Sequence, residues 1–159
     1  MKSIPFYVVF ALLIVGCDVT CDVKFGGAGA NPKIRELDLK KPQKDAEVVV
    51  TAYFQALATN GYAEAAANFG PQPFQMMSRE QWIQAQQDFS SKRGSYVNHK
   101  FKRRTVRLKV GTSDTTTTVT VECQVTYSQH NDIETFSLTK GPTDGDFKIV
   151  GHKLGSPPK

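Results

Sequence analysis

The spacing of hydrophobic residues changes near Ser95, and this change constrains the fold more than any other feature of the sequence. Before Ser95, apolar residues recur every three or four positions, as on one face of an α-helix. After it, they alternate with polar residues, as on a half-buried strand. Helices followed by strands with short turns predict an α+β domain, with the helices packed on an antiparallel sheet of about four strands. At 159 residues, the chain has room for one such domain.

Three helices are expected in the first half of the domain. The first begins at Asp45, whose carboxylate can cap the first turn, and ends near Gly61. A short alanine-rich helix follows as far as a Gly-Pro break. The third begins after Ser78, because Ser78 and Gln81 form a capping-box pattern, and it reaches about Lys92.

Four strands are expected in the second half. Their alternating apolar residues are Val106, Leu108 and Val110; Val119, Val121, Cys123, Val125 and Tyr127; Phe136 and Leu138; and a final segment from Phe147 to Leu154. Segments rich in Gly, Asn and Asp at 111–114, 129–132 and 141–146 supply the turns. This pattern makes Cys123 a small buried residue of the second strand.

The N-terminus has the organisation of a signal peptide. Lys2 is followed by an uncharged, apolar run from Ile4 to Val15. As a helix, this run would reach about 18 Å, short of the roughly 30 Å hydrocarbon core of a bilayer. A cleavable leader is therefore favoured over a permanent membrane span.

The apolar run ends in Ile14-Val15-Gly16-Cys17, which resembles the lipobox of bacterial lipoproteins. That resemblance implies that residues 1–16 are removed and that Cys17 becomes an N-terminal residue carrying acyl chains such as palmitate. The alternative is a general secretory signal with an incidental cysteine. Asp18 resembles the signal that retains lipoproteins in the inner membrane of enteric bacteria, so the inner membrane is slightly favoured over the outer.

The mature chain divides into a tether, a domain and a tail. Residues 17–44 are rich in Gly, Pro and charged side chains, which predicts a flexible spacer after the lipid anchor. The α+β domain is expected over 45–155, and 156–159 form a disordered tail. The predicted location is the cell envelope, with the domain facing the periplasm.

The three cysteines, Cys17, Cys21 and Cys123, fit neither a disulfide framework nor a zinc site. With lipid on Cys17, two thiols remain. A bridge between Cys21 and Cys123 stays open, but the interpretation favoured here leaves Cys21 as a free thiol or an intermolecular link.

Four segments carry a resemblance to a known superfamily: Tyr53–Leu57, Ala65–Phe69, Gln81-Trp82 and Phe147–Gly151. In their order they resemble the cone-shaped fold of the nuclear transport factor two and ketosteroid isomerase superfamily. Within it, the chain is similar to a bacterial domain-of-unknown-function family numbered 4019, whose members are often exported. The resemblance implies a cone of helices on a curved sheet and leaves function open, because this fold hosts enzymes and binding modules alike.

A catalytic or metal site is not expected. An isomerase of this superfamily would need a buried acidic base and a tyrosine on one interior face, whereas the acidic residues here fall mainly in expected turns or on polar faces, as Asp132 does. His99, His130 and His152 lack metal-ligand spacing, with His130 expected in solvent and His152 partly buried. We therefore expect no enzyme activity, no cofactor and no metal.

A run of basic residues on the first expected strand is the most conspicuous candidate site. Alternation predicts that Phe101, Arg103, Thr105, Arg107 and Lys109 share one face. The candidate anion-binding or partner-binding residues are Arg103, Arg104, Arg107 and Lys109. The alternative is a solvated strand whose charges discourage aggregation at a sheet edge. Nucleic acid is not expected, because aromatic residues do not alternate with the charges as a stacking platform requires.

Three functions are compatible with these features. The first is a membrane-anchored, non-catalytic envelope lipoprotein that binds a protein or an anionic envelope component. The second is an immunity or inhibitor lipoprotein that neutralises a secreted toxin or lytic enzyme, and a protruding charged loop would favour it. The third is a pocket enzyme, which a deep cavity with an unpaired carboxylate would favour.

Overall fold

The computed structural model describes residues 39–110 and 115–155. The predicted leader, the lipidation site Cys17, Asp18, Cys21 and most of the expected tether lie outside the described residues, as do the turn at 111–114 and the tail at 156–159. The fold described below therefore concerns the domain alone.

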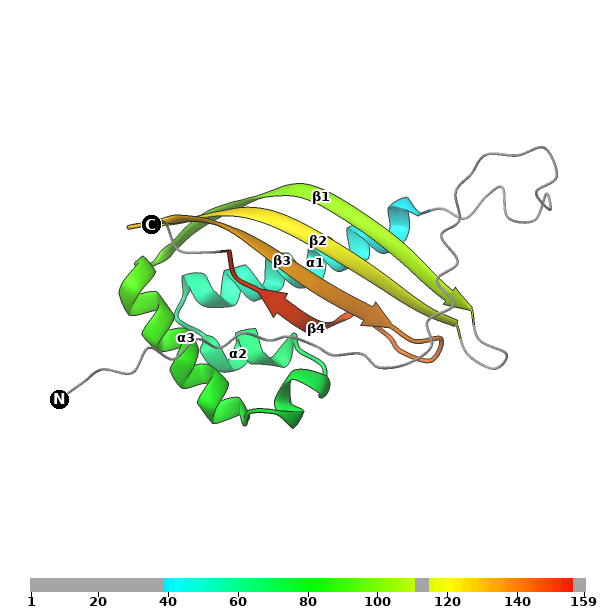
Figure 1. The fold of residues 1–159 in the computed structure, drawn as a ribbon, viewed down its shortest axis with the longest axis horizontal. Coiled ribbons are helices and arrows are strands. Elements are labelled where there is room, and N and C mark those ends of the chain that lie inside the picture. The colour runs from blue at the N-terminus through cyan, green and yellow to red at the C-terminus, as the bar shows by residue number, and fades with distance from the viewer. Residues whose placement is uncertain (1–38, 111–114, 156–159) are drawn as a thin grey trace.

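The described chain forms helices first and strands second (Figure 1). The helices are α1 (Lys40–Ala58), α2 (Tyr62–Ala67), a single 3-10 turn η2 (Gln72–Gln75) and α3 (Arg79–Arg93). The strands are β1 (Tyr96–Val110), β2 (Thr115–Tyr127), β3 (Asn131–Lys140) and β4 (Lys148–Lys153). The strands form one antiparallel sheet in the order β1-β2-β3-β4.

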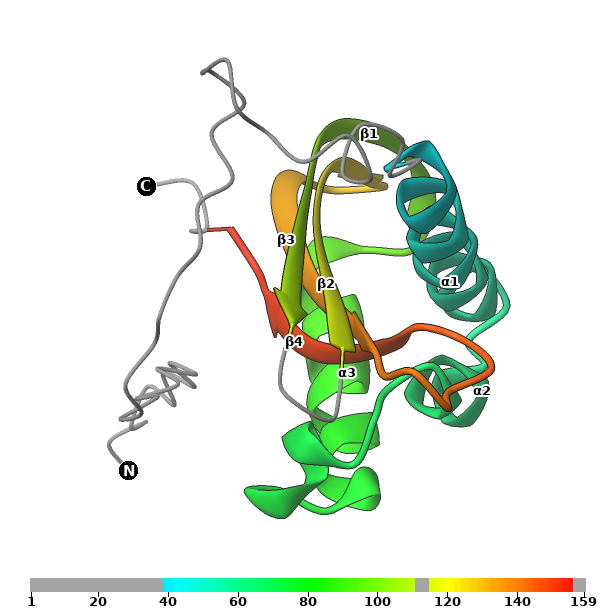
Figure 2. The same ribbon diagram turned by 90° about the vertical axis from the view of Figure 1, so that its right-hand side faces the viewer.

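The sheet is curved and unclosed, and its concave face holds the helices (Figure 1). Turned by 90°, the molecule shows α1 and α2 on one side of the strands and α3 at their lower ends, while none of the described helices covers the other side (Figure 2). The predicted fold class, helices on an antiparallel sheet of four strands, is confirmed. We call the uncovered side of the sheet the outer face.

The core lies between α1 and the concave face of the sheet. Four alternate residues of β2 are fully buried, namely Val119, Val121, Cys123 and Val125, as the alternating pattern predicted. Tyr53 of α1 occupies the centre, because its ring contacts the rings of Phe54, Phe69, Trp82, Phe136 and His152. Edge-to-face contacts of this kind add to the stabilisation from burial.

The helix boundaries follow local chemistry. The capping box predicted for α3 is present: Gln81 N–H donates to Ser78 Oγ, and Ser78 N–H donates to Gln81 Oε1. The start of α1 was predicted at Asp45 and is found at Lys40. Asp45 instead accepts a hydrogen bond from Lys41 one turn earlier, and Pro42 is tolerated because it lies in the first turn.

Within the described ranges, none of the helices is both long and apolar enough to cross a bilayer.

Candidate functional site

The predicted basic residues lie on β1, which forms one edge of the sheet and, among the described strands, pairs only with β2. Arg103, Arg104 and Arg107 are all exposed, as expected for an edge strand. Lys109 belongs to β1 by its backbone, and its side chain lies outside the part of the chain that is described.

A bulge in β1 changes which of these residues share a face. Phe101 lies opposite Cys123, but Arg103 already lies opposite Glu122, so Lys102 is the additional residue. One extra residue shifts the following side chains to the other face of the strand. Arg103 and Arg107 therefore lie on the outer face, whereas Phe101 faces the core.

This register corrects one part of the sequence prediction. Phe101 does not share a face with Arg103 and Arg107. Arg104 lies opposite Val121, a buried residue, and therefore on the helix-facing side. There Arg104 forms an ion pair with Glu47 of α1, and its guanidinium lies 5.2 Å from the centre of the Phe101 ring. The ion pair of Arg104 with Glu47 therefore connects α1 with β1.

A row of exposed cations remains on the outer face of β1. Lys100 lies opposite exposed Gln124, Arg103 opposite Glu122 and Arg107 opposite Thr118. We call Lys100, Arg103 and Arg107 the outer row. Among the residues that the structure describes, no carboxylate forms an ion pair with any of the three.

The rest of the outer face is polar and uncharged for the most part. The residues of β2 and β3 that alternate with the buried ones include Thr118, Thr120, Thr126, Thr135, Ser137 and Thr139. Threonine suits a wet strand surface because it is both β-branched and polar. The outer row therefore borders a hydroxyl-bearing surface. It lies on the side of the curved sheet that no described helix covers (Figure 2).

A second candidate lies inside the fold, where sequence analysis placed none. Glu134 of β3 is fully buried. Its Oε1 accepts a 2.5 Å hydrogen bond from the Tyr127 hydroxyl, and its Oε2 lies 2.8 Å from His152 Nε2. Because a carboxylate can only accept, the His152 ring carries its proton on Nε2.

Two further charged residues complete this group. Arg93, the last residue of α3, places Nη1 2.7 Å from Asp132 Oδ2 and 3.7 Å from Glu134 Oε1. Both carboxylates are buried. We call Arg93, Tyr127, Asp132, Glu134 and His152 the Glu134 cluster.

The two carboxylates of the cluster have opposite pKa shifts. Burial by itself would raise the pKa of Glu134, but the hydrogen bond and charge of His152, the Tyr127 hydroxyl and Arg93 together lower it below its usual range. For Asp132, burial outweighs the attraction of Arg93 and raises the pKa. Burial, with the Glu134 charge, also raises the pKa of Tyr127. Tyr127 therefore acts as a hydrogen-bond donor to an ionised Glu134.

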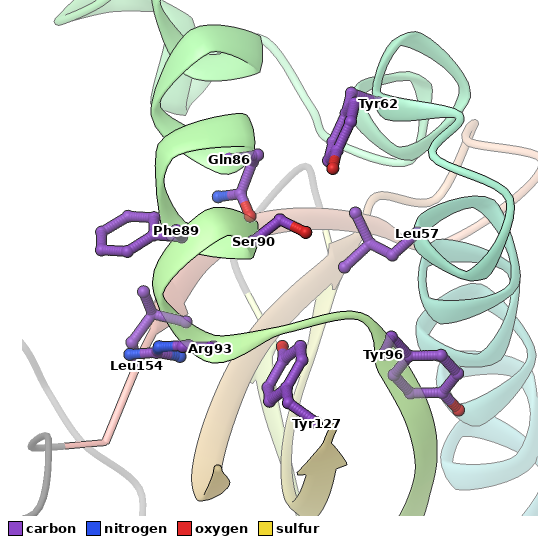
Figure 3. A pocket seen from close by; sticks show the side chains of 9 residues that line it. All are labelled: Leu57, Tyr62, Gln86, Phe89, Ser90, Arg93, Tyr96, Tyr127 and Leu154. Carbon is purple, nitrogen blue, oxygen red and sulfur yellow. The ribbon is translucent and has the colours of Figure 1, made fainter. Parts of the chain in front are cut away.

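A pocket lies beside the cluster, between α1, α3 and the strands (Figure 3). Ser90 of α3 and Leu57 of α1 point toward each other across it, and Arg93 and Tyr127 of the cluster also line it. The cavity volume is about 20 Å³, which is close to the room that a single water needs. In this conformation the pocket holds no substrate-sized cavity.

The Tyr53 hydroxyl, near the cluster, has no hydrogen-bond partner among the described residues. It is fully buried, and burial together with the Glu134 charge raises its pKa well above the usual value. An unpaired buried hydroxyl is costly, so this position lowers the stability of the interior.

The sequence contained a signal for the cluster that the turn assignment hid. Asp132 was placed in a turn, but β3 begins at Asn131. Read backwards from Phe136 and Leu138, the alternation puts Glu134 and Asp132 on the same inner face. His152 was predicted to be partly buried, and its side chain is 7% exposed. His130, predicted to be solvated, has a buried Nε2 without a partner in the described chain.

No group of three or more His, Cys, Asp or Glu residues in the described ranges is arranged to hold a metal ion.

Comparison with known proteins gives the fold alone. The sequence matches no protein-family model and no curated protein sequence. The structure is similar to that of Aln2 from a Streptomyces species, with a TM-score of 0.51 and 11% identity, over 76% of this chain and 93% of that one. It also matches Bd1075 of Bdellovibrio bacteriovorus at 12% identity over 75% of this chain and 41% of that one. The TM-score of this second match is 0.43. The shared helix-plus-antiparallel-sheet fold is compatible with a nuclear transport factor two-like cone.

Proposed function

We propose that this protein is a membrane-anchored, non-catalytic lipoprotein of the bacterial envelope that binds an anionic envelope component or a protein through the outer row. The observation that carries the proposal is the bulge at Lys102, which places Arg103 and Arg107 on one exposed face. Two cations held without an intrachain ion pair among the described residues leave their charge available to an external anion.

The anchor part of the proposal is supported by the sequence. The segment Ile14-Val15-Gly16-Cys17 resembles a lipobox, and we propose that Cys17 carries the lipid and that residues 17–38 link it to the domain. Two or three acyl chains hold a protein at a membrane for long periods. The domain would then face the periplasm, with Asp18 slightly favouring the inner membrane.

The finer family assignment is part of the same proposal. The order of α1, α2, α3 and four antiparallel strands supports membership in the nuclear transport factor two-like superfamily. The exported family of unknown function numbered 4019 is the proposed neighbour within it.

Binding is favoured over catalysis by the state of the interior. A catalytic carboxylate needs a free oxygen beside a cavity, whereas both oxygens of Glu134 have partners and the adjacent space is about the size of one water. The exposed cations of β1 are the groups that can meet a partner without a change of conformation.

The test is sedimentation of the protein with vesicles that contain anionic phosphatidylglycerol, and with vesicles of neutral phosphatidylcholine alone. We compare wild type with the double variant Arg103→Glu/Arg107→Glu. The control is Lys44→Glu/Lys92→Glu, which changes the net charge equally at exposed helix positions. The expected result is a loss of at least about tenfold in binding to anionic vesicles for the first variant only.

Equal losses in both double variants would mean that net charge alone drives adsorption, and the outer row would not be a site. Capture of a lytic enzyme by wild type and not by Arg103→Glu/Arg107→Glu would instead support the alternative of an immunity or inhibitor lipoprotein on the same surface.

A further inference from the structure

The free edge of β1 is a second property of this strand. The sheet begins at β1, and the edge of β1 that faces away from β2 is bonded to no strand within the described residues. The opposite end of the sheet differs, because Ile149 of β4 forms a bridge with Phe69. Every second backbone N–H and C=O along the free edge of β1 is therefore open to an incoming extended chain.

The inner side of β1 is incompletely covered. Val106 lies opposite Val119, and Phe101 lies opposite Cys123. The two β2 residues are fully buried, whereas Val106 and Phe101 are only partly buried. The apolar layer of the core thus reaches the edge and stops there, and a strand added beside β1 would cover it with apolar side chains of its own.

The outer side of β1 favours acidic side chains, not apolar ones, on an added strand. Arg103 and Arg107 project to the outer face, on either side of Thr105. Side chains directly opposite on neighbouring strands interact, so acidic residues there would be favoured and basic ones disfavoured. Pairing of two β1 edges would bring these cations together, which argues against a second copy of the chain as the occupant.

We infer that the edge of β1 from Arg103 to Leu108 accepts an extended peptide segment of a partner protein, in which acidic and apolar residues alternate, as an added fifth strand. Backbone hydrogen bonds would supply affinity, and the alternation would supply specificity. This inference rests on the proposed function, because it names the partner class that the same basic face would recognise.

The test uses fluorescence anisotropy with a short peptide of alternating glutamate and valine. The comparison peptide has the same composition in two blocks, with all glutamates before all valines. Two N-methylated forms of the alternating peptide block its amides along one edge or along the other. We expect the alternating peptide to bind at least about tenfold more tightly than the block peptide, and one N-methylated form alone to lose binding.

The protein variants separate this inference from the proposed function. Arg103→Glu/Arg107→Glu should weaken binding of the alternating peptide at least about tenfold, whereas Lys44→Glu/Lys92→Glu should leave that binding unchanged. If all four peptides bind wild type equally and all are lost in Arg103→Glu/Arg107→Glu, the added strand is wrong and the anion-binding face stands. If no peptide and no anionic vesicle distinguishes the two double variants, both proposals fail.

Discussion

The Tyr127 hydroxyl donates a 2.5 Å hydrogen bond to Glu134 Oε1, which ties the end of β2 to an ionised carboxylate inside the core. The second carboxylate oxygen is held by His152 of β4, and Arg93 brings the end of α3 to the same place. One buried charge therefore connects α3 with three strands. Breaking a buried charge pair is costly because the remaining group has no solvent to replace its partner.

Replacing Glu134 with glutamine tests how much this charge contributes to stability. Glu134→Gln keeps the shape of the side chain but removes the charge that faces Arg93 and His152. We expect the free energy of unfolding to fall by about 3 kcal/mol, measured by urea denaturation. The control is Glu64→Gln at an exposed position of α2, for which a change within about 0.5 kcal/mol is expected. Equal small changes in both variants would contradict a stabilising cluster.

The same cluster predicts how stability depends on pH. The pKa of Glu134 is lower in the folded protein than its usual value of 4.5. The unfolded chain therefore takes up the proton first as the pH falls below 4.5, so the contribution of Glu134 is present above that pH and is lost below it. Asp132 acts in the opposite sense, because its pKa is raised in the folded protein. Its contribution is greatest at low pH and decreases as the pH rises through the folded pKa.

Urea denaturation from about pH 3 to pH 7 checks this dependence. Wild type should lose stability below pH 4.5, and Glu134→Gln should show a smaller loss over the same range. Glu64→Gln should follow the wild-type curve. A wild-type curve that rises toward low pH would mean that Asp132 outweighs Glu134.

The sequence predicted the helices and strands of this fold. It predicted neither the bulge in β1 nor the buried Glu134 cluster. The change of hydrophobic period separated helices from strands, and Ser78 with Gln81 located the start of α3. The bulge at Lys102 has no signature of its own, because an extra residue among exposed polar side chains leaves the alternation of Val106 and Leu108 unchanged. Phe101 was therefore assigned to the same face as Arg103 and Arg107.

The buried cluster was missed for a different reason. Turn-forming residues extend from Gln129 to Asp132, and they made the end of the turn appear later than it is. A buried carboxylate also contradicts the usual preference of charged residues for solvent, and only the spatial arrangement of His152 and Arg93 makes it tolerable. Those partners come from other elements, so local sequence patterns do not indicate them.

Gly94 is predicted to be sensitive to any added side chain. It ends α3 with φ +80°, and an added Cβ would lie 2.0 Å from Ser128 Oγ and 3.0 Å from the Gln129 amide nitrogen. Gly94→Ala should lower the free energy of unfolding by about 1–3 kcal/mol, because both the backbone and the contact are strained. Gly145→Ala is the matched control, since nothing lies within 4 Å of its added Cβ. Both free energies of unfolding are measured by urea denaturation. Similar losses for the two variants would contradict the close packing of Gly94 against Ser128 and Gln129.

The Cys123 thiol is predicted to be unreactive in the folded protein. Cys123 is fully buried, and burial, followed by the charge of Glu134, raises the pKa of its thiol from 9.0 to about 12. This shift lowers the reactive thiolate fraction near neutral pH by about a thousandfold.

The measurement of this reactivity is thiol titration of the lipidated Cys21→Ser variant with an aromatic disulfide reagent. If lipid blocks Cys17, Cys123 is the one thiol that can respond. We expect its reaction to be at least about a hundredfold slower in the folded state than in denaturant. In wild type, two thiols should appear on unfolding without reductant if Cys21 is free. No thiol without reductant would indicate a bridge between Cys21 and Cys123, and a single thiol would indicate an intermolecular link through Cys21. Rapid reaction of the folded variant would contradict the burial of Cys123, because a thiolate must reach solvent to attack the reagent.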